Sequence, residues 1–434
     1  MPTHLVFISL FLGIVSGKQQ VELHADASVK SIRILLAAEE IARLTRPPWQ
    51  GEIDLGSELV PRELQAIAYD ESGNEIGRAS QTINLPRPAA EVEIVLERSG
   101  GFPSAAQLRW RNLEYADPKS ATMTFDGAPI KVDSKFRARL PRTDWQRPHV
   151  IEAQMKFADG MIARREAVLE GAVFSDVAQA ELTPILLTET SRPRVSLDGC
   201  LSLDGAPVRT AAVEKESANV ILVQDPEPRD AIRALDPARA ATNRYTRRGL
   251  QSWVRLDDDT TQQILWPVAE QFRNRSSHES SLLFAHTDEF PASDGLLQLL
   301  TLDEHSTRNK PRRYADAVAV AGIRAIADGR RRAVVLVLSD HADASKSDPH
   351  AVRRYLQSIG VALFVWSLSG PRPDLADTWG PVDDISSIDY LRAAVSRLRA
   401  TLAAQHVAWV HVDPLSALRV KADERCGVTT TVSR

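Results

Sequence analysis

Hydrophobic and polar residues alternate along the first third of the chain in short segments that end at turn residues. The segments "LQAIAYD" (64–70) and "EIGRASQTINL" (75–85) have the two-residue period of strands with one buried face. The intervening "ESGN" (71–74) is typical of a turn. Such signals recur about every ten residues, as expected of a small sandwich. The pattern predicts a small β-sandwich over residues 18–88.

A second β-sandwich is predicted over residues 89–171, after the linker Pro86-Arg87-Pro88. Asp126-Gly127 and Asp159-Gly160 each stand between alternating segments, and Asp-Gly is a strong hairpin signal. We assign Trp110 and Trp145 to the core of this domain. A β-rich connector is predicted over residues 172–217.

The pattern changes at Ala218, where continuous apolar runs begin to alternate with helical segments. The runs include "NVILVQD" (219–225), "RAVVLVLSD" (332–340) and "VALFVWSL" (361–368). The helical segments include 314–329, 348–360 and 386–405, the second with an Asp cap and a Pro in its first turn. Apolar strands between helices predict a mostly parallel sheet covered on both faces. The expected fold is an α/β doubly wound (Rossmann-like) domain over 218–405, followed by a C-terminal β segment over 406–434.

The N-terminus carries an apolar run from Leu5 to Val15, which is too short to span a bilayer. Small residues end the run at Ser16-Gly17, and a polar segment starts at Lys18. We interpret residues 1–17 as a signal peptide, so the protein is expected to be exported to the periplasm, the cell surface or the medium. The basic group before the run is His4 alone. The alternative is a buried first strand.

Composition narrows the class of protein. A chain of 434 residues is expected to form two to four domains. The net charge of −4 is small, which argues against nucleic acid or an acidic membrane surface as partner. After the first run no segment reaches about 18 apolar residues, so the mature chain is expected not to span a membrane. The sequence leaves the protein partner and the oligomeric state open.

The chain has two cysteines, Cys200 and Cys426. In an exported protein they can form a disulfide if their Cα atoms lie within about 7 Å of each other. The alternative is that each is a small buried hydrophobic side chain.

Two carboxylates stand where ligands bind in an α/β sheet, at the carboxyl ends of strands: Asp225 after "VILVQ" and Asp340 after "VVLVLS". Here the chain resembles the von Willebrand factor type A domain, in the divergent form found in exported bacterial proteins behind β-sandwich domains. The resemblance implies that the two N-terminal β-sandwich domains, 18–88 and 89–171, are immunoglobulin-like (Ig-like). The resemblance rests on "VILVQD", "YADAVAVAGIRAIADGRRRAVVLVLSD" and "VRRYLQSIGVALFVWSL", and it covers about 218–405.

The resemblance implies a metal-ion-dependent adhesion site, in which an Asp-x-Ser-x-Ser loop, a Thr and a further Asp hold Mg²⁺ through oxygen atoms. Asp225 matches the first Asp, Glu227 and Arg229 match the two serines, Arg312 falls near the Thr, and Asp340 matches the last Asp. Both serine hydroxyls are missing, and an arginine cannot ligate a cation. We therefore hypothesise a degenerate, metal-free site in which Arg229 or Arg312 pairs with a buried pair of carboxylates, Asp225 and Asp340.

Other candidate chemistry is weaker. Five residues with metal-binding side chains lie in loops near the same sheet edge without a recognised zinc spacing: His286, Asp288, His341, Asp343 and His350. The sequence has no Gly-x-Ser-x-Gly, phosphate-binding glycine loop or His-Glu-x-x-His motif. The preferred function is an exported, non-enzymatic interaction protein of the adhesion type, without a cofactor. The alternatives are Mg²⁺-dependent adhesion through Asp225, Glu227 and Asp340, or a structural scaffold subunit; an exported hydrolase is disfavoured.

Overall fold

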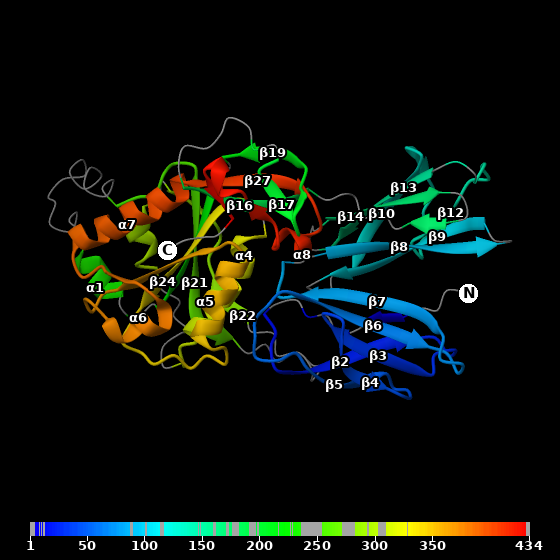
Figure 1. Cartoon of the computed structure of the whole chain (residues 1–434), viewed down its shortest axis with the longest axis horizontal. Coiled ribbons are helices and arrows are strands. Elements are labelled where there is room, and N and C mark those ends of the chain that lie inside the picture. The colour runs from blue at the N-terminus through cyan, green and yellow to red at the C-terminus, as the bar shows by residue number, and fades with distance from the viewer. Residues whose placement is uncertain are drawn as a thin grey trace. The chain divides into compact units, whose positions relative to one another are not determined.

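The chain forms two compact units in the computed structural model (Figure 1). Met1–Pro86 and Leu182–Arg434 make up the first unit, and Arg87–Glu181 the second. The structure describes residues 5–430 except for 8, 10, 12–13, 87–89, 100–101, 113–116, 146, 148, 159–161, 171–172, 176–181, 191–196, 198, 216, 226, 228, 236–253, 271–282, 293–294, 303–309 and 328.

Two small antiparallel sheets form a β-sandwich at the start of the first unit. One sheet has the order β1-β2-β5, with bounds Leu5–Phe7, Lys18–Ala25 and Gln50–Asp54. The other has the order β4-β3-β6-β7, with bounds Glu39–Leu44, Ser31–Leu36, Arg62–Tyr69 and Glu75–Ile83. Val21 and Leu23 of β2 point into the core between the sheets, since alternate residues of a strand share a face.

The N-terminal apolar run is part of this sandwich. Leu5–Phe7 pairs antiparallel with β2, and its outer residues are buried in the core. The side-chain amide of Asn84 accepts from the backbone N–H of Val15 at 2.8 Å and donates to its carbonyl at 3.1 Å. Gln81 likewise donates to the carbonyl of Ser9 at 3.1 Å. Leu5–Phe7 therefore has the arrangement expected from the alternative interpretation of the N-terminus, a buried first strand.

The second unit is also built of antiparallel sheets around one core. A three-stranded sheet has the order β12-β9-β8, with bounds Arg137–Arg139, Phe102–Asn112 and Ala90–Ser99. A five-stranded sheet has the order β11-β10-β13-β14-β15, with bounds Ala128–Ile130, Pro118–Phe125, His149–Phe157, Ile162–Glu170 and Val173–Ser175.

Sequence expectations for this unit are met in part. Asp126-Gly127 forms the predicted hairpin turn, with Phe125 paired to Ala128 and positive φ angles of 51° and 76°. Trp145 packs against the core, as expected. Trp110 does not: it is 38% exposed and contacts Phe136 at the surface, so its assignment to the core was wrong. Asp159-Gly160 lies outside the described residues.

The first unit also contains a seven-stranded sheet whose central strands are parallel. Its order is β22-β21-β20-β24-β25-β26, and β23 pairs with β21. Parallel pairing joins β21 to β20, β20 to β24, β24 to β25 and β25 to β26, whereas β22 and β23 are antiparallel to β21. In the order of the chain the strands are Ala218–Gln224 (β20), Thr260–Glu270 (β21), Leu283–His286 (β22), Phe290–Pro291 (β23), Arg331–Leu338 (β24), Ala362–Ser367 (β25) and Val382–Asp384 (β26).

Both faces of this sheet are covered, which explains why its central strands consist largely of apolar residues. Every residue of β20 and β24 is buried. Val220 and Leu222 share a core with α3 and α7, and Ile221 and Val223 share another with α4 and α5. The helices are Arg229–Ala234 (α1), Leu296–Leu299 (α3), Tyr314–Ala325 (α4), Pro349–Ser358 (α5), Pro373–Trp379 (α6) and Ile388–Ala403 (α7). Among the described helices, none has the length and apolar character needed to cross a membrane.

The predicted connector and the C-terminal segment together form two small sheets that share one hydrophobic core. One sheet has the order β19-β27-β16-β29, with bounds Thr210–Glu214, Gln405–His411, Leu182–Glu189 and Val428–Thr429. Another has the order β18-β17-β28, with bounds Ala206–Pro207, Leu201–Leu203 and Lys421–Ala422. The chain between β27 and β29 also forms the short helices α8 (Pro414–Ala417) and η4 (Glu424–Cys426).

Candidate functional site

The candidate site lies at the carboxyl ends of β20 and β24, next to the N-terminus of α4. Asp225 follows β20 directly, and Ser339 follows β24 directly. Arg312 and Tyr314 come from the segment that enters α4. Strands that run parallel bring their carboxyl ends to one edge of a sheet, so side chains far apart in the sequence meet here.

Asp225 is fully buried and accepts four hydrogen bonds from the protein. Its Oδ2 accepts from Arg312 Nε at 2.9 Å, from the Tyr314 hydroxyl at 3.0 Å and from Ser339 Oγ at 2.7 Å. Its Oδ1 accepts from the backbone N–H of Glu227 at 3.0 Å. Burial by itself raises the pKa of Asp225, but the hydrogen bonds from Arg312, Glu227 and Ser339 outweigh it and hold the pKa below its usual value.

Arg312 supplies the counter-charge to Asp225. Its side chain is 6% exposed, and its Nη1 donates to the carbonyl of Lys310 at 2.7 Å. Its Nη2 lies 3.7 Å from Glu227 Oε2. A buried carboxylate is stable when it is both paired with a cation and hydrogen-bonded, and Asp225 meets both conditions. Arg229 is the first residue of α1, and its side chain lies outside the described part of the chain.

Asp340 does not join this buried pair, which corrects the expectation that one arginine serves both carboxylates. Its side chain is 78% exposed. It accepts from Arg372 Nη1 at 3.0 Å and from Ser369 Oγ at 3.0 Å. The neighbouring residue, Ser339, takes the inward direction. A second buried carboxylate would need its own counter-charge, and the described contacts of Arg312 are with other groups.

Glu227 and His341 form the exposed rim of the site. Their side chains are 60% and 46% exposed, and His341 Nε2 is hydrogen-bonded to Glu227 Oε2. Three side chains here offer one ligand atom each, and these atoms lie within 4.8 Å of one another: Asp225, Glu227 and His341. Among the described residues, this is the group whose spacing could hold a metal ion. The remaining loop candidates for zinc, His286, Asp288, Asp343 and His350, are outside this group.

The residues at this edge do not fit a Mg²⁺ ion. Both oxygens of Asp225 are used by protein donors, so a cation would have to displace them. The guanidinium of Arg312 lies beside both Asp225 and Glu227 and would repel a second cation. Mg²⁺ also requires near-octahedral oxygen ligands, whereas His341 offers nitrogen. We therefore derive no chemistry from a Mg²⁺ ion at this site.

Asp343, an exposed residue in the loop after β24, joins that loop to the start of α4. Its Oδ1 accepts from the backbone N–H of Tyr314 at 2.9 Å, and its Oδ2 from that of Ala315 at 3.1 Å. The first N–H groups of a helix have no partners within the helix, so this side chain caps α4 from the loop after β24. In return, Asp316 of α4 accepts from the backbone N–H groups of Lys346 and Ser347, both at 3.0 Å.

Sequence reasoning missed Tyr314 and Ser339 at the site, and it considered Asp343 only as a metal ligand. Tyr314 reads as the first residue of an amphipathic helix, and its aromatic ring is indeed buried in the core. Its hydroxyl reaches Ser339 Oγ at 2.7 Å as well as Asp225. A weak signal was available: a serine beside an aspartate at a strand end offers two polar side chains, one of which can face inward.

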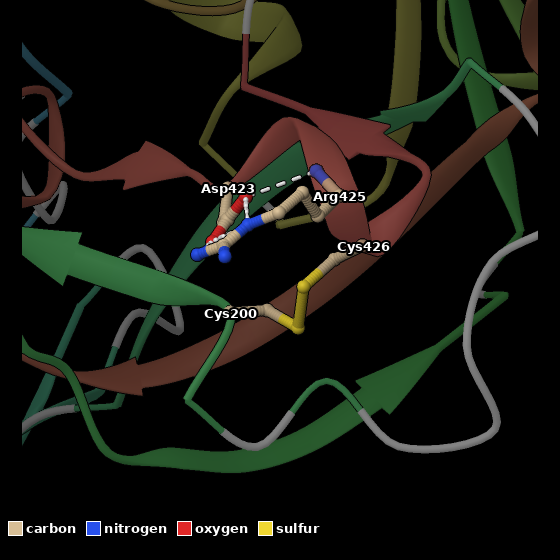
Figure 2. The surroundings of a disulfide bond; sticks show 4 residues. All are labelled: Cys200, Asp423, Arg425 and Cys426. Carbon is tan, nitrogen blue, oxygen red and sulfur yellow. Dashed lines mark hydrogen bonds and ion pairs between the residues drawn. A yellow bond between two sulfur atoms is a disulfide. The ribbon is translucent and has the colours of Figure 1, made fainter.

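The two cysteines are joined by a disulfide (Figure 2). The S–S distance is 2.06 Å, the Cα atoms are 6.1 Å apart, and both residues are buried. The backbone N–H of Asp423 donates to the carbonyl of Cys200 at 2.8 Å, and Arg425 forms an ion pair with Asp423 in the same turn. Cys200 directly precedes β17, and Cys426 is the last residue of η4. The bond therefore joins a segment that comes before the α/β sheet in the sequence to one that comes after it.

Comparisons with known proteins find matches among solved structures. No model of a protein family matches this sequence, and a search of curated proteins finds no match. Fibronectin type III-like modules of CbhA from Clostridium thermocellum are similar, with 16% identity, 18% of this chain and 93% of that chain covered, and a TM-score of 0.17.

Two further structures are similar over larger parts of this chain. For the central fibronectin type III array of RIM-binding protein the values are 8% identity, 48% of this chain, 85% of that chain and a TM-score of 0.24. For a β-glycosidase from Bacteroides vulgatus they are 8%, 39%, 24% and 0.21. The modular neighbours belong to the fibronectin and immunoglobulin-like class of β-sandwich. At these identities and TM-scores none of them assigns an activity to this chain.

Proposed function

We propose that this protein is a von Willebrand factor A-like binding protein that engages a protein partner without a metal bridge. The family assignment is supported by the parallel order β21-β20-β24-β25 and by a carboxylate directly after the central strand β20. The observation that carries the metal-free function is the state of Asp225. Its oxygens accept from Arg312, Tyr314, Ser339 and a backbone N–H, so the protein itself satisfies the carboxylate.

A binding role accounts for the exposed rim better than hydrolysis does. Ser339, the serine nearest the site, shares hydrogen bonds with the Tyr314 hydroxyl and with Asp225. Activation of a serine as a nucleophile requires a base such as an imidazole on its Oγ. His341 contacts Ser339 through its backbone N–H at 3.3 Å, and its imidazole is hydrogen-bonded to Glu227 instead. We therefore propose a non-enzymatic function for this edge.

The proposed location is outside the cytoplasm. Disulfides persist in oxidising compartments and are rare in the cytosol. Cys200 and Cys426 form a buried disulfide, which is consistent with export. The disulfide alone supports this proposal, because Leu5–Phe7 pairs with β2 and belongs to the core of the first sandwich.

A metal-dependent function remains the second candidate, on one observation. Asp225, Glu227 and His341 bring one ligand atom each within 4.8 Å of one another. A set with one imidazole nitrogen suits zinc or another transition metal better than Mg²⁺. This version replaces Asp340 with His341, because Asp340 faces solvent and Arg372.

A photo-crosslinking residue at position 340 tests the proposed function in cells that produce the protein naturally. Asp340 is 78% exposed and is not one of the three candidate metal ligands, so the substitution leaves both the Asp225 network and those ligands in place. We expect an adduct of discrete mass that forms equally with and without EDTA. The matched control is position 71, an exposed acidic residue in a turn of the first sandwich. The proposal fails if position 340 gives no adduct, or if both positions give the same one. An adduct that EDTA abolishes would favour the metal-dependent candidate.

A further inference from the structure

His149, the first residue of β13 in the second unit, is surrounded by polar and aromatic groups. Its side chain is 8% exposed. Nδ1 lies 2.7 Å from Asp126 Oδ2, and Nε2 lies 3.0 Å from the backbone carbonyl oxygen of Asp144. The ring of Phe125 is stacked on the imidazole at 5.1 Å, and Trp145 meets it edge-on at 5.4 Å. His149 therefore connects the β10–β11 turn to the loop that precedes β13.

Each ring nitrogen of His149 lies within hydrogen-bond distance of an accepting oxygen, and this arrangement favours the doubly protonated imidazolium. A neutral imidazole has one N–H and one lone pair. If the proton is on Nδ1, the lone pair of Nε2 points at the Asp144 carbonyl. If it is on Nε2, the lone pair of Nδ1 points at the Asp126 carboxylate. The Thr143 hydroxyl, 3.4 Å from Nε2, is a longer contact than the Asp144 carbonyl. Only the doubly protonated imidazolium donates to both acceptors.

The charges around His149 favour this form. The Asp126 carboxylate also accepts from the backbone N–H of Val150 at 2.8 Å, which fixes it beside the ring. The carboxylate of Asp144 adds negative charge nearby and lies 3.7 Å from Arg147, one of two arginines in the same loop. Burial by itself lowers the pKa of His149, but the hydrogen bonds to Asp126 and Asp144 outweigh it and raise the pKa above its usual value. Aromatic rings around a cation add further stabilisation.

We propose that His149 is a proton-operated lock in the second β-sandwich. While doubly protonated, it ties the loop that carries Asp144 and Trp145 to the Asp126-Gly127 turn. When it loses a proton, one of the two hydrogen bonds is replaced by repulsion between a lone pair and an oxygen, and the loop is released. Trp145, which packs edge-on against Phe125 at 6.0 Å, moves with that loop. The loop is therefore held against the Asp126-Gly127 turn at low pH and is released as the pH rises.

The test uses the full chain and two measurements across about pH 5 to 9, the range in which histidines titrate. NMR of the imidazole groups gives the titration of His149, which is compared with the value of about 6.5 for a histidine in a model peptide. Hydrogen–deuterium exchange, corrected for its intrinsic pH dependence, gives the protection of the segment from Thr143 to Val150. We expect His149 to titrate above the model-peptide value. Protection should fall by about tenfold or more as His149 loses its proton, because a charge-assisted hydrogen bond is lost.

Asp126→Asn is the decisive variant. Asn-Gly is the preferred pair for this hairpin turn and tolerates the φ of 51° at position 126, so the turn is kept and only the charge is removed. We expect the titration of His149 to move to lower pH and the protection of the loop to change at that lower pH. His149→Gln should remove the pH dependence of the protection. The proposal is overturned if His149 titrates at or below the model-peptide value of about 6.5, or if loop protection does not follow its titration.

Discussion

The guanidinium of Arg312 lies 2.9 Å from the carboxylate of Asp225, and both side chains are buried at the carboxyl edge of the parallel sheet. This position is where the resemblance to the von Willebrand A domain implies a divalent cation. An arginine that pairs with Asp225 supplies positive charge there permanently, and it also carries N–H donors that a metal ion lacks. This ion pair underlies the predictions below on stability, on its pH dependence and on the effect of metal ions.

Removing either partner of this pair should destabilise the protein strongly. Arg312→Met leaves Asp225 buried without a counter-charge, and such changes cost about 3–5 kcal/mol of unfolding free energy. The measurement is denaturant unfolding followed by circular dichroism. Asp340→Ala is the matched control, because this carboxylate is 78% exposed, and it should change the free energy by less than about 0.5 kcal/mol. Equal effects of the two substitutions would contradict the difference in burial.

The stability contributed by Asp225 should depend on pH with a definite sign. Its pKa in the folded protein is lowered, so the contribution is present above the unfolded value of about 3.9 and is lost as the pH falls through the folded value. Unfolding free energy measured from about pH 6 down to pH 2 should therefore decrease at the acid end. Asp225→Asn removes the titrating group and should make this decrease smaller. An unchanged acid slope in the variant would show that other groups cause it.

Metal ions should leave the stability of the protein unchanged. A ligand at 100 times its dissociation constant stabilises the folded state by about 2.7 kcal/mol, which gives a visible shift of the melting temperature. We expect no shift with millimolar Mg²⁺ relative to EDTA, since the oxygens of Asp225 are occupied. Zn²⁺ is the discriminating ion. A saturable shift with Zn²⁺ that His341→Ala abolishes would establish the second candidate function instead.

The disulfide should stabilise the two small sheets that the connector and the C-terminal segment form together. Cys200 and Cys426 are 226 residues apart in the sequence, and cross-links that close long loops typically contribute about 2–5 kcal/mol. Cys200→Ser with Cys426→Ser should lower the midpoint of denaturation by a corresponding amount. Reducing agent should lower the midpoint of the wild-type protein and have no effect on the double variant. A reducing agent that acts equally on both proteins would point to another cause.

The N-terminal segment gives a further prediction, on stability. A chain that begins at Lys18 loses the burial of Leu5 and Phe7, each worth about 1.5–3 kcal/mol. It also leaves the buried amides of Gln81 and Asn84 without their contacts to the segment. We expect it to unfold at lower temperature than the chain that begins at Met1. N-terminal sequencing of the protein purified from cells shows which chain exists there. If both chains melt at the same temperature, the segment contributes nothing to the sandwich.

The period of the hydrophobic pattern was the signal that predicted strands and helices. Two-residue alternation marked β6 and β7, and the all-apolar runs marked β20, β24 and β25, because strands buried on both faces have no polar side. Local chemistry set the helix ends. Asp348 caps α5 by accepting from the backbone N–H groups of His350 and Ala351, as its place before a proline indicated. Each of these signals lies within a few residues of the feature that it predicts.

The sequence by itself therefore determined the elements, and it placed Asp225 and Arg312 among the candidates for one edge of a sheet. Tertiary structure alone decided which side chains meet there. It chose Ser339 over Asp340 as the inward neighbour of Asp225, and it made Asp343 a helix cap. These choices depend on contacts between residues 28 to 114 positions apart in the sequence. Periodicity and spacing report on neighbours along the chain, whereas the pairing of buried charges depends on the packing of whole elements.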